Sequence, residues 1–255
     1  MTVTGETLLD YHDELLSIAR LQGKTGGLTM KAADAAGKMS GSAVATLGGI
    51  TPEAVQSALE QVFTRLLDAS SFANGFTPVR RAPIMLNKIG STLSGAAGGA
   101  FGLAGVLPDI LSSTTLIYNS IQKIAMKHGF DPEDPEIRLE CVEVFGSGAP
   151  GEDEPGQSYV FTKVAVNGAT VTGILNRVSA RFASVILSKL GAQAVPVVGA
   201  FTGAAINYAF MSHYEKLAEI RFRLLRLKRD YPDRDMMTDY RAALAQVKPR
   251  PRRST

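Results

Sequence analysis

The residue types that carry out chemistry in proteins are few in this 255-residue chain, and they are widely spaced. The chain has one cysteine, Cys141, and three histidines, His12, His128 and His213. None of these histidines forms the HExxH pair of a zinc site, and the cysteine would need a neighbouring base to act as a nucleophile. The sequence therefore identifies no catalytic residue, and we expect neither a metal nor a cofactor.

Motifs that activate a serine or bind a nucleotide are also missing from the sequence. It contains no GxSxG elbow, no GxxxxGK[ST] loop and no GxGxxG after a strand. The glycine-rich segments lack the lysine and hydroxyl that hold phosphate groups. These absences argue against an α/β-hydrolase or a P-loop nucleotidase.

Two sets of carboxylates stand out by their position. Asp109 follows twenty uncharged residues, where desolvation would raise its pKa unless a partner satisfied it. We interpret it either as a buried functional acid or as the N-cap of the helix that follows. The acids of residues 131–136 lack the spacing of an EF-hand loop, and Asp-Pro pairs are typical of helix starts, so we predict that they cap a helix.

Two uncharged stretches rich in small residues, 89–108 and 190–214, are the elements that we expect to organise the fold. Small side chains four residues apart let two helices approach closely. Because each glycine costs about 0.5–1 kcal/mol in a helix relative to alanine, both stretches must gain stability from packing. We predict that they pack together at the centre through Gly95, Gly98, Gly99, Gly102, Gly199 and Gly203.

The stretch 89–108 also has the length of about 20 residues that spans a bilayer. It carries few large apolar side chains, so a single aspartate near mid-bilayer would cancel its insertion energy. We favour a buried or membrane-contacting hairpin over a spanning helix.

Helical periodicity covers most of the rest of the chain. Helices are predicted over residues 7–21, 52–72, 110–127, 135–145, 159–190, 215–230 and 235–246. The expected fold is therefore all-α, a multi-helix single domain around the two glycine-rich helices or hairpins. We divide it into an N-terminal helical region (1–80), a core (81–230) with a mobile acidic loop (146–158), and a short helix with a basic disordered tail (231–255).

Basic residues gather at the C-terminal end. The net charge is +3, but residues 215–255 hold twelve Lys and Arg against six Asp and Glu. An amphipathic basic helix of this kind attracts anionic membranes or acidic partners, or else packs on the core with its charges solvated. The predicted basic surface consists of Lys216, Arg221, Arg223, Arg226, Lys228 and Arg229. No nucleic acid is expected, since aromatic residues do not alternate with the basic ones.

Several stretches resemble the EcsC family of bacterial proteins. They are SGAAGGAFGLAGVLPDI at 94–110, IQKIAMKHGFDPEDPE at 121–136, VPVVGAFTGAAIN at 195–207, and the helix after it. That family takes its name from a bacterial operon that also encodes an ABC transporter, and some members carry peptidase or hydrolase labels. The resemblance implies no catalytic residue that we can match to a position here.

Together these observations favour a non-enzymatic cytoplasmic protein at the inner face of the membrane, or beside a membrane transport or secretion complex. A single cysteine fits a reducing compartment, and the acidic N-terminal residues do not form a secretion signal. Two alternatives stay open: a hydrolase with a site near Asp109 and Asn207, and a protein that binds a lipid or another apolar ligand. The oligomeric state is not predicted.

Overall fold

The computed structural model describes residues 5–25, 52–68, 103–147, 168–193 and 199–247. Within them the chain is all-α, which confirms the predicted fold class. The helices are α1 (Gly5–Gln22), α4 (Pro52–Leu67), α8 (Leu103–Lys127), α9 (Pro135–Glu143), the 3₁₀ helix η1 (Val144–Gly146), α10 (Gly168–Gln193), α11 (Gly199–Asp230) and α12 (Met236–Val247).

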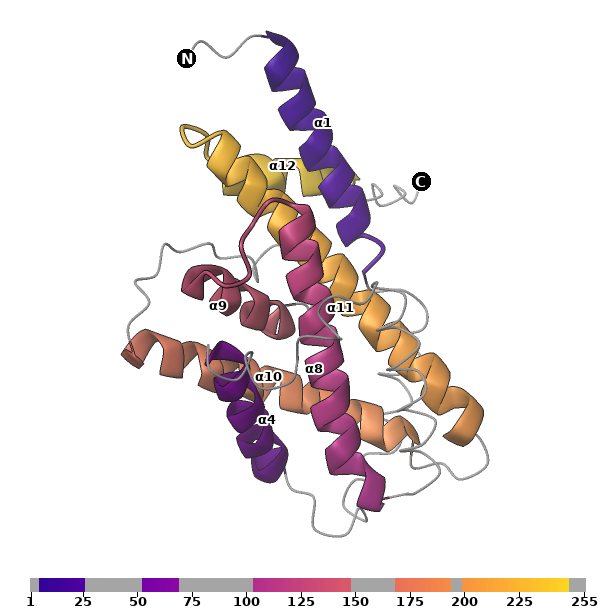
Figure 1. Ribbon diagram of the computed structural model, residues 1–255. Helices are drawn as coiled ribbons and strands as arrows, with labels where there is room; N and C mark the ends of the chain where they lie inside the picture. The colour runs from indigo at the N-terminus through magenta and orange to yellow at the C-terminus, as the bar shows by residue number, and fades with distance from the viewer. Residues whose placement is uncertain (1–4, 26–51, 69–102, 148–167, 194–198, 248–255) are drawn as a thin grey trace, which may run out of the picture.

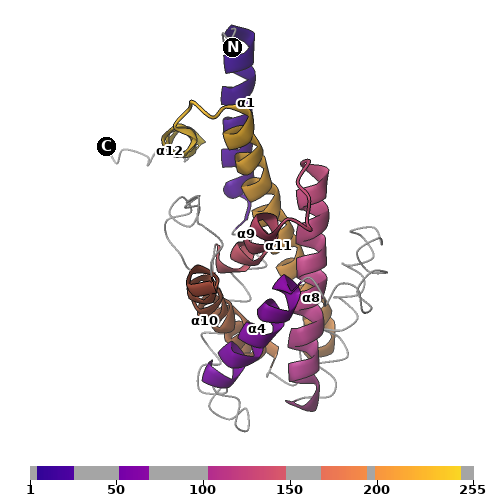
Figure 2. The ribbon, with the colours of Figure 1, turned by 60° about the vertical axis from the view of Figure 1, so that its left-hand side comes forward.

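Helix α11 is a long helix against which other described helices pack (Figure 1). Its 32 residues extend about 48 Å at 1.5 Å per residue. α1 and α12 pack against its C-terminal part, and α8 lies along its other side. In the second view α4 and α10 again lie next to each other, away from α1 (Figure 2). α11 thus links two groups of helices.

An aromatic cluster forms the centre of the group around α4 and α10. Phe63 of α4, Phe145 of η1, Phe182 of α10 and Tyr214 of α11 meet with ring centroids 4.9 to 6.1 Å apart. Each such pair contributes roughly 0.5–1.5 kcal/mol beyond the area that it buries. Rings from four separate elements therefore hold this part of the core together.

The two N-terminal helices each bury one apolar face. On α4 the buried residues are Val55, Leu59, Val62, Phe63 and Leu66. On α1 the buried apolar residues are Tyr11, Leu15, Ile18 and Ala19. Both helices therefore contribute to the same hydrophobic core as the helices that follow them.

Helix α4 ends at Leu67, five residues before the predicted end. The Tyr118 hydroxyl donates to the Leu66 carbonyl (3.4 Å) and the Arg138 guanidinium to the Leu67 carbonyl (3.3 Å). Carbonyls at a helix C-terminus lack intrahelical partners, and a cation there also opposes the helix dipole. Side chains of α8 and α9 thus satisfy the end of α4.

Helix α8 begins at Leu103 and continues through Pro108 and Asp109. The prediction that Asp109 is the N-cap of this helix is therefore wrong. A proline near the start of a helix removes only one backbone hydrogen bond, which tertiary packing can offset. The C-terminal end is as predicted: Gly129 has a positive φ of 79°, and the amide of Phe130 bonds to the Ala125 carbonyl in a Schellman motif.

The next turn leads directly into α9, as predicted. The Asp134 carboxylate accepts a hydrogen bond from the Glu136 amide (2.8 Å), and Pro135 is the first helical residue. Further along, the uncharged stretch from Gly199 and the basic helix expected to follow it form one continuous helix, α11.

The predicted contact between the two glycine-rich stretches stays a prediction. Gly95, Gly98, Gly99 and Gly102 lie outside the described residues. Gly199 and Gly203 are in the first two turns of α11, but their side-chain surroundings are not described.

Candidate functional site

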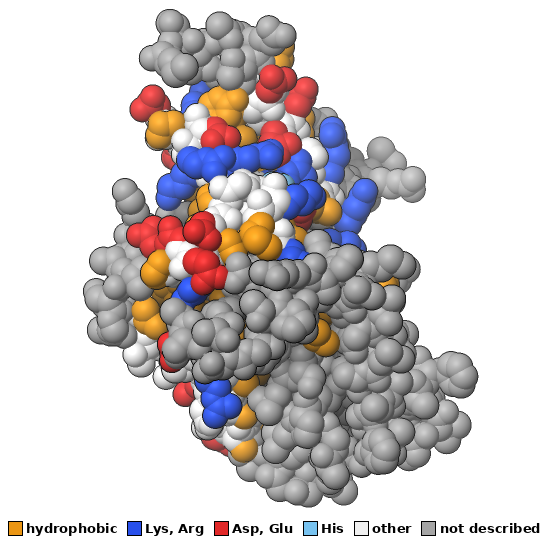
Figure 3. Space-filling view, in the orientation of Figure 1, with side chains coloured by type: hydrophobic (Ala, Val, Ile, Leu, Met, Phe, Trp, Pro, Cys, Tyr) orange, Lys and Arg blue, Asp and Glu red, His pale blue; other side chains and the backbone are white. Residues whose placement is uncertain are grey.

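A gathering of charged side chains on the described residues lies where α11 passes between α1 and the C-terminal end of α8. Figure 3 shows Lys and Arg side chains in a band across this part of the molecule. Six cationic residues lie on the helices that meet here or just after them, as the contacts described below show, and we call this set the basic seam: Lys24, Lys127, Lys216, Arg223, Arg226 and Arg229. Four of the six come from α11.

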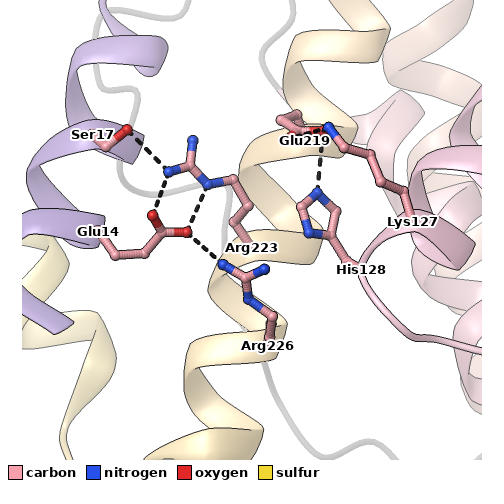
Figure 4. A network of polar contacts seen from close by, with 7 residues as sticks. All are labelled: Glu14, Ser17, Lys127, His128, Glu219, Arg223 and Arg226. Carbon is pink, nitrogen blue, oxygen red and sulfur yellow. Dashed lines mark hydrogen bonds and ion pairs between the residues drawn. The ribbon is translucent and has the colours of Figure 1, made fainter. Parts of the chain in front are cut away.

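On one side of the seam, Glu14 of α1 holds two arginines of α11 (Figure 4). Arg223 donates to both oxygens of its carboxylate, from Nε (2.8 Å) and Nη2 (2.6 Å), and Arg226 adds a third hydrogen bond (2.8 Å). Ser17 accepts a further bond from Arg223 (3.0 Å). Hydrogen bonds from Arg223, aided by the charge of Arg226, outweigh desolvation and lower the pKa of Glu14.

On the other side, Glu219 of α11 holds the end of α8 (Figure 4). Its carboxylate accepts from Lys127 Nζ (3.1 Å) and lies 3.2 Å from Nε2 of His128. Desolvation acts to raise the pKa of Glu219, but the bonds to His128 and Lys127 together lower it. Glu14 and Glu219 thus tie α1 and α8 to the same stretch of α11.

Some seam cations also satisfy helix ends. Lys216 donates a long hydrogen bond to the carbonyl of Lys24 (3.5 Å), just after α1. Arg229 donates to the carbonyl of Gly129 (3.4 Å) and lies over the Phe130 ring, 5.1 Å from its centroid. Cations are favourable at these negative helix ends, so part of the seam's basicity is structural.

The seam nevertheless has a surplus of positive charge that faces solvent. Four of its six cations, Lys127, Arg223, Arg226 and Arg229, pair with three carboxylates, those of Glu14, Glu219 and Asp230. The exposed fraction of the side chain is 62% for Lys127, 50% for Arg229 and 36% for Arg226. An anionic surface could therefore reach these groups without unfolding the helices.

Arg221 does not lie on the predicted basic surface. It is buried, with 1% exposure, and it pairs with Glu140 and Glu143 of α9. A buried guanidinium needs such partners because an uncompensated buried charge costs several kcal/mol. Burial raises the pKa of Glu143 despite the opposing charge of Arg221. Of the other predicted surface residues, Lys228 is exposed.

Of the residues singled out for catalysis, the structure describes the surroundings of Cys141 but not those of Asp109 and Asn207. Cys141 is completely buried, and burial raises the pKa of its thiol, with the Glu140 charge adding to the effect. Asp109 and Asn207 lie in α8 and α11, but the surroundings of their side chains are outside the described residues, so a hydrolase site there stays a prediction. In the described part of the chain, no three His, Cys, Asp or Glu residues cluster as metal ligands.

Helix α8 carries buried polar side chains that the sequence did not single out. Gln122 and Thr114 are fully buried and Asn119 is nearly so. Neither carboxamide atom of Gln122 has a hydrogen-bond partner among the described residues, nor has the Thr114 hydroxyl or the Asn119 amide nitrogen. The only signal for them was a run of polar residues inside an otherwise apolar helical pattern.

Two further findings bear on function. None of the helices that the structure describes is long and apolar enough to cross a membrane. The model of a family described as the EcsC protein family matches residues 80–227. Comparisons with curated proteins and with solved structures give no match.

Proposed function

The chain belongs to the EcsC protein family, and from this premise we propose that it is a non-catalytic helical protein of the cytoplasm that attaches to the anionic inner face of the membrane. The basic seam and the C-terminal tail make the attachment. The observation that carries the proposal is the surplus of exposed cations where α11 passes between α1 and α8.

The charge of this region suits a peripheral contact. A Lys or Arg near an anionic leaflet contributes about 1 kcal/mol, and the contribution fades within a Debye length of about 8 Å at physiological salt. The tail, residues 248–255, adds four Lys and Arg and no acid. Its charge follows α12, which packs on α1 and α11 next to the seam.

A binding role also agrees better with the described chemistry than a catalytic one. The thiol of Cys141 is buried in the core, and its raised pKa keeps it protonated. Glu14 and Glu219 accept hydrogen bonds from cations, which lowers the pKa of both carboxylates and suits them to hold helices together. A membrane transport or secretion complex is the alternative partner, to which an acidic protein surface would offer similar chemistry.

Flotation of the full chain with vesicles tests the proposal. We expect binding to phosphatidylcholine vesicles that contain phosphatidylglycerol, no binding to pure phosphatidylcholine, and release at high salt. The variant K127Q/R229Q should bind roughly tenfold more weakly, since each lost cation weakens attachment by about 1 kcal/mol or less. Removal of residues 248–255 should weaken it further.

The matched control removes two exposed arginines outside the seam, in R65Q/R241Q. This variant has the same net charge as K127Q/R229Q, so equal losses would mean that only the overall charge matters. Circular dichroism establishes that each variant is folded. A wild-type chain that fails to float with anionic vesicles at low salt would refute the attachment.

A further inference from the structure

The way Glu14 holds its two arginines is the geometry with which arginine binds phosphate. A guanidinium presents two parallel N–H groups that match two oxygens of a carboxylate or a phosphate. Arg223 makes this two-point contact with Glu14, and Arg226 donates to the same carboxylate from the next turn of α11. The pair is therefore already arranged around one anionic group.

The position of α1 does not depend on this carboxylate alone. Leu15 and Ile18 are completely buried, and the Tyr11 ring packs at a tilt against that of Tyr231, with ring centroids 4.8 Å apart. His213 adds a hydrogen bond from α11 to the carbonyl of Thr25 (2.9 Å). Glu14 can therefore turn away from the arginines while the helix stays in place.

Solvent can also reach the pair. The side chains of Glu14 and Arg226 are 22% and 36% exposed, so neither is sealed in the core. Lys127 and Arg229 approach from the side of α8 and add positive charge to the same seam. A phosphate arriving from solvent meets an open edge of the ion pair with further cations beside it.

We propose that Glu14 is a resident competitor that occupies Arg223 and Arg226 until the phosphate groups of anionic lipids replace it. The inference rests on the proposed function and specifies how that attachment is regulated. In the exchange, the lipid phosphate accepts the hydrogen bonds of the two guanidinium groups, and the Glu14 carboxylate turns to solvent. The seam would then bind a membrane more weakly in the free protein than its count of cations suggests.

Neutralising Glu14 tests this inference against a closely matched control. E14Q frees the arginine pair of its competing charge, whereas D13N makes the same charge change at an exposed neighbour. With phosphatidylglycerol vesicles we expect E14Q to bind roughly fivefold tighter than wild type, the gain typical of about one additional cation near an anionic leaflet. We expect D13N to change binding less than twofold.

Two further variants keep the outcome decisive. Adding R223Q and R226Q to E14Q should abolish the gain, because the arginines are then absent. E14D replaces E14Q if that variant does not fold. It keeps the charge on a shorter side chain that cannot reach both arginines, so its binding should be between that of wild type and that expected of E14Q. Thermal unfolding of each variant checks that α1 stays docked.

Equal gains for E14Q and D13N, or wild-type binding without a gain in E14Q, would overturn the inference and leave the attachment itself standing. Absence of binding by wild type and all variants would overturn the attachment as well. Binding by E14Q without binding by wild type would refute the attachment of the wild-type chain and support only a site that Glu14 keeps closed.

Discussion

Arg221 and Arg223 are two residues apart on α11, yet their environments are opposite. Arg221 is buried against two carboxylates of α9, and Arg223 lies in the seam against Glu14 of α1. Sequence reasoning put both on one basic surface, since an arginine alone does not show which helix will cover it. Glu140 and Glu143, three residues apart on a short helix, were the available signal for a buried partner.

At the same scale, Gln122 of α8 can be tested, because its carboxamide has no hydrogen-bond partner in the part of the chain that the structure describes. Met has nearly the shape of Gln, and replacing an unsatisfied buried polar group by an apolar one of equal size removes a desolvation penalty. We expect Q122M to raise the free energy of unfolding by about 1 kcal/mol, as measured by chemical denaturation.

The matched control is Q56M on α4, because the Gln56 carboxamide bonds to Glu60 (3.0 Å) and Asn176 (3.2 Å). That substitution should not stabilise the protein. Destabilisation by Q122M would instead show that a water molecule or a ligand normally satisfies Gln122.

At the scale of helices, boundaries could be predicted where they depend on neighbours in the chain. The Asp134-Pro135 start of α9 and the Gly129 end of α8 follow from capping chemistry that is local. The end of α4 could not be predicted, because it depends on Tyr118 and Arg138 from later helices. The start of α8 was missed for a related reason, since a proline ends a helix only if packing does not sustain it.

The end of α8 gives the prediction at this scale. A Cβ atom at position 129 would lie 3.7 Å from the Arg229 guanidinium, so G129A introduces no clash. Its cost comes from the positive φ alone and should be about 1 kcal/mol in the free energy of unfolding. G173A, at an exposed position in the second turn of α10 with no atom within 4 Å of the added Cβ, should stabilise the protein by up to about 1 kcal/mol.

We therefore expect thermal unfolding to show G129A less stable and G173A more stable than wild type. A G129A protein as stable as wild type would mean that α8 can end without the left-handed residue.

At the scale of the whole molecule, α11 is one helix where the sequence predicted two elements, the uncharged stretch and the basic helix after it. The all-α class followed from helical periodicity, but the continuity of α11 across Tyr214 did not, because its uncharged and basic halves look like separate elements. The candidate site was found only in part. Sequence located the basic helix, whereas the carboxylates that hold it, Glu14 and Glu219, lie about two hundred residues away or on the same helix.

From the pKa shifts of these two carboxylates we predict how the stability of the folded protein changes at acid pH. Their pKa values in the folded protein lie below the ordinary value of 4.5, so their stabilising contribution is complete above that value and is lost as pH falls through the folded pKa. We expect E14Q/E219Q to unfold at lower denaturant concentration than wild type at neutral pH. The difference should shrink at pH values below 4.5.

The control for the pH series is D10N/D13N, which neutralises two exposed acids of α1. Its midpoint of unfolding by denaturant should match that of wild type at every pH in the series. If the stability difference between wild type and E14Q/E219Q did not depend on pH, the contribution of Glu14 and Glu219 would not be ionic.

The buried thiol has a practical consequence for following these helices in solution. The chain has a single cysteine, Cys141, and its thiol is buried in the core. Maleimide dyes will therefore not react with the native protein. A cysteine introduced on the surface of α1 and another on α12 would then accept a fluorophore pair without prior removal of the natural one. Energy transfer between the two labels could report whether α1 moves as vesicles are added.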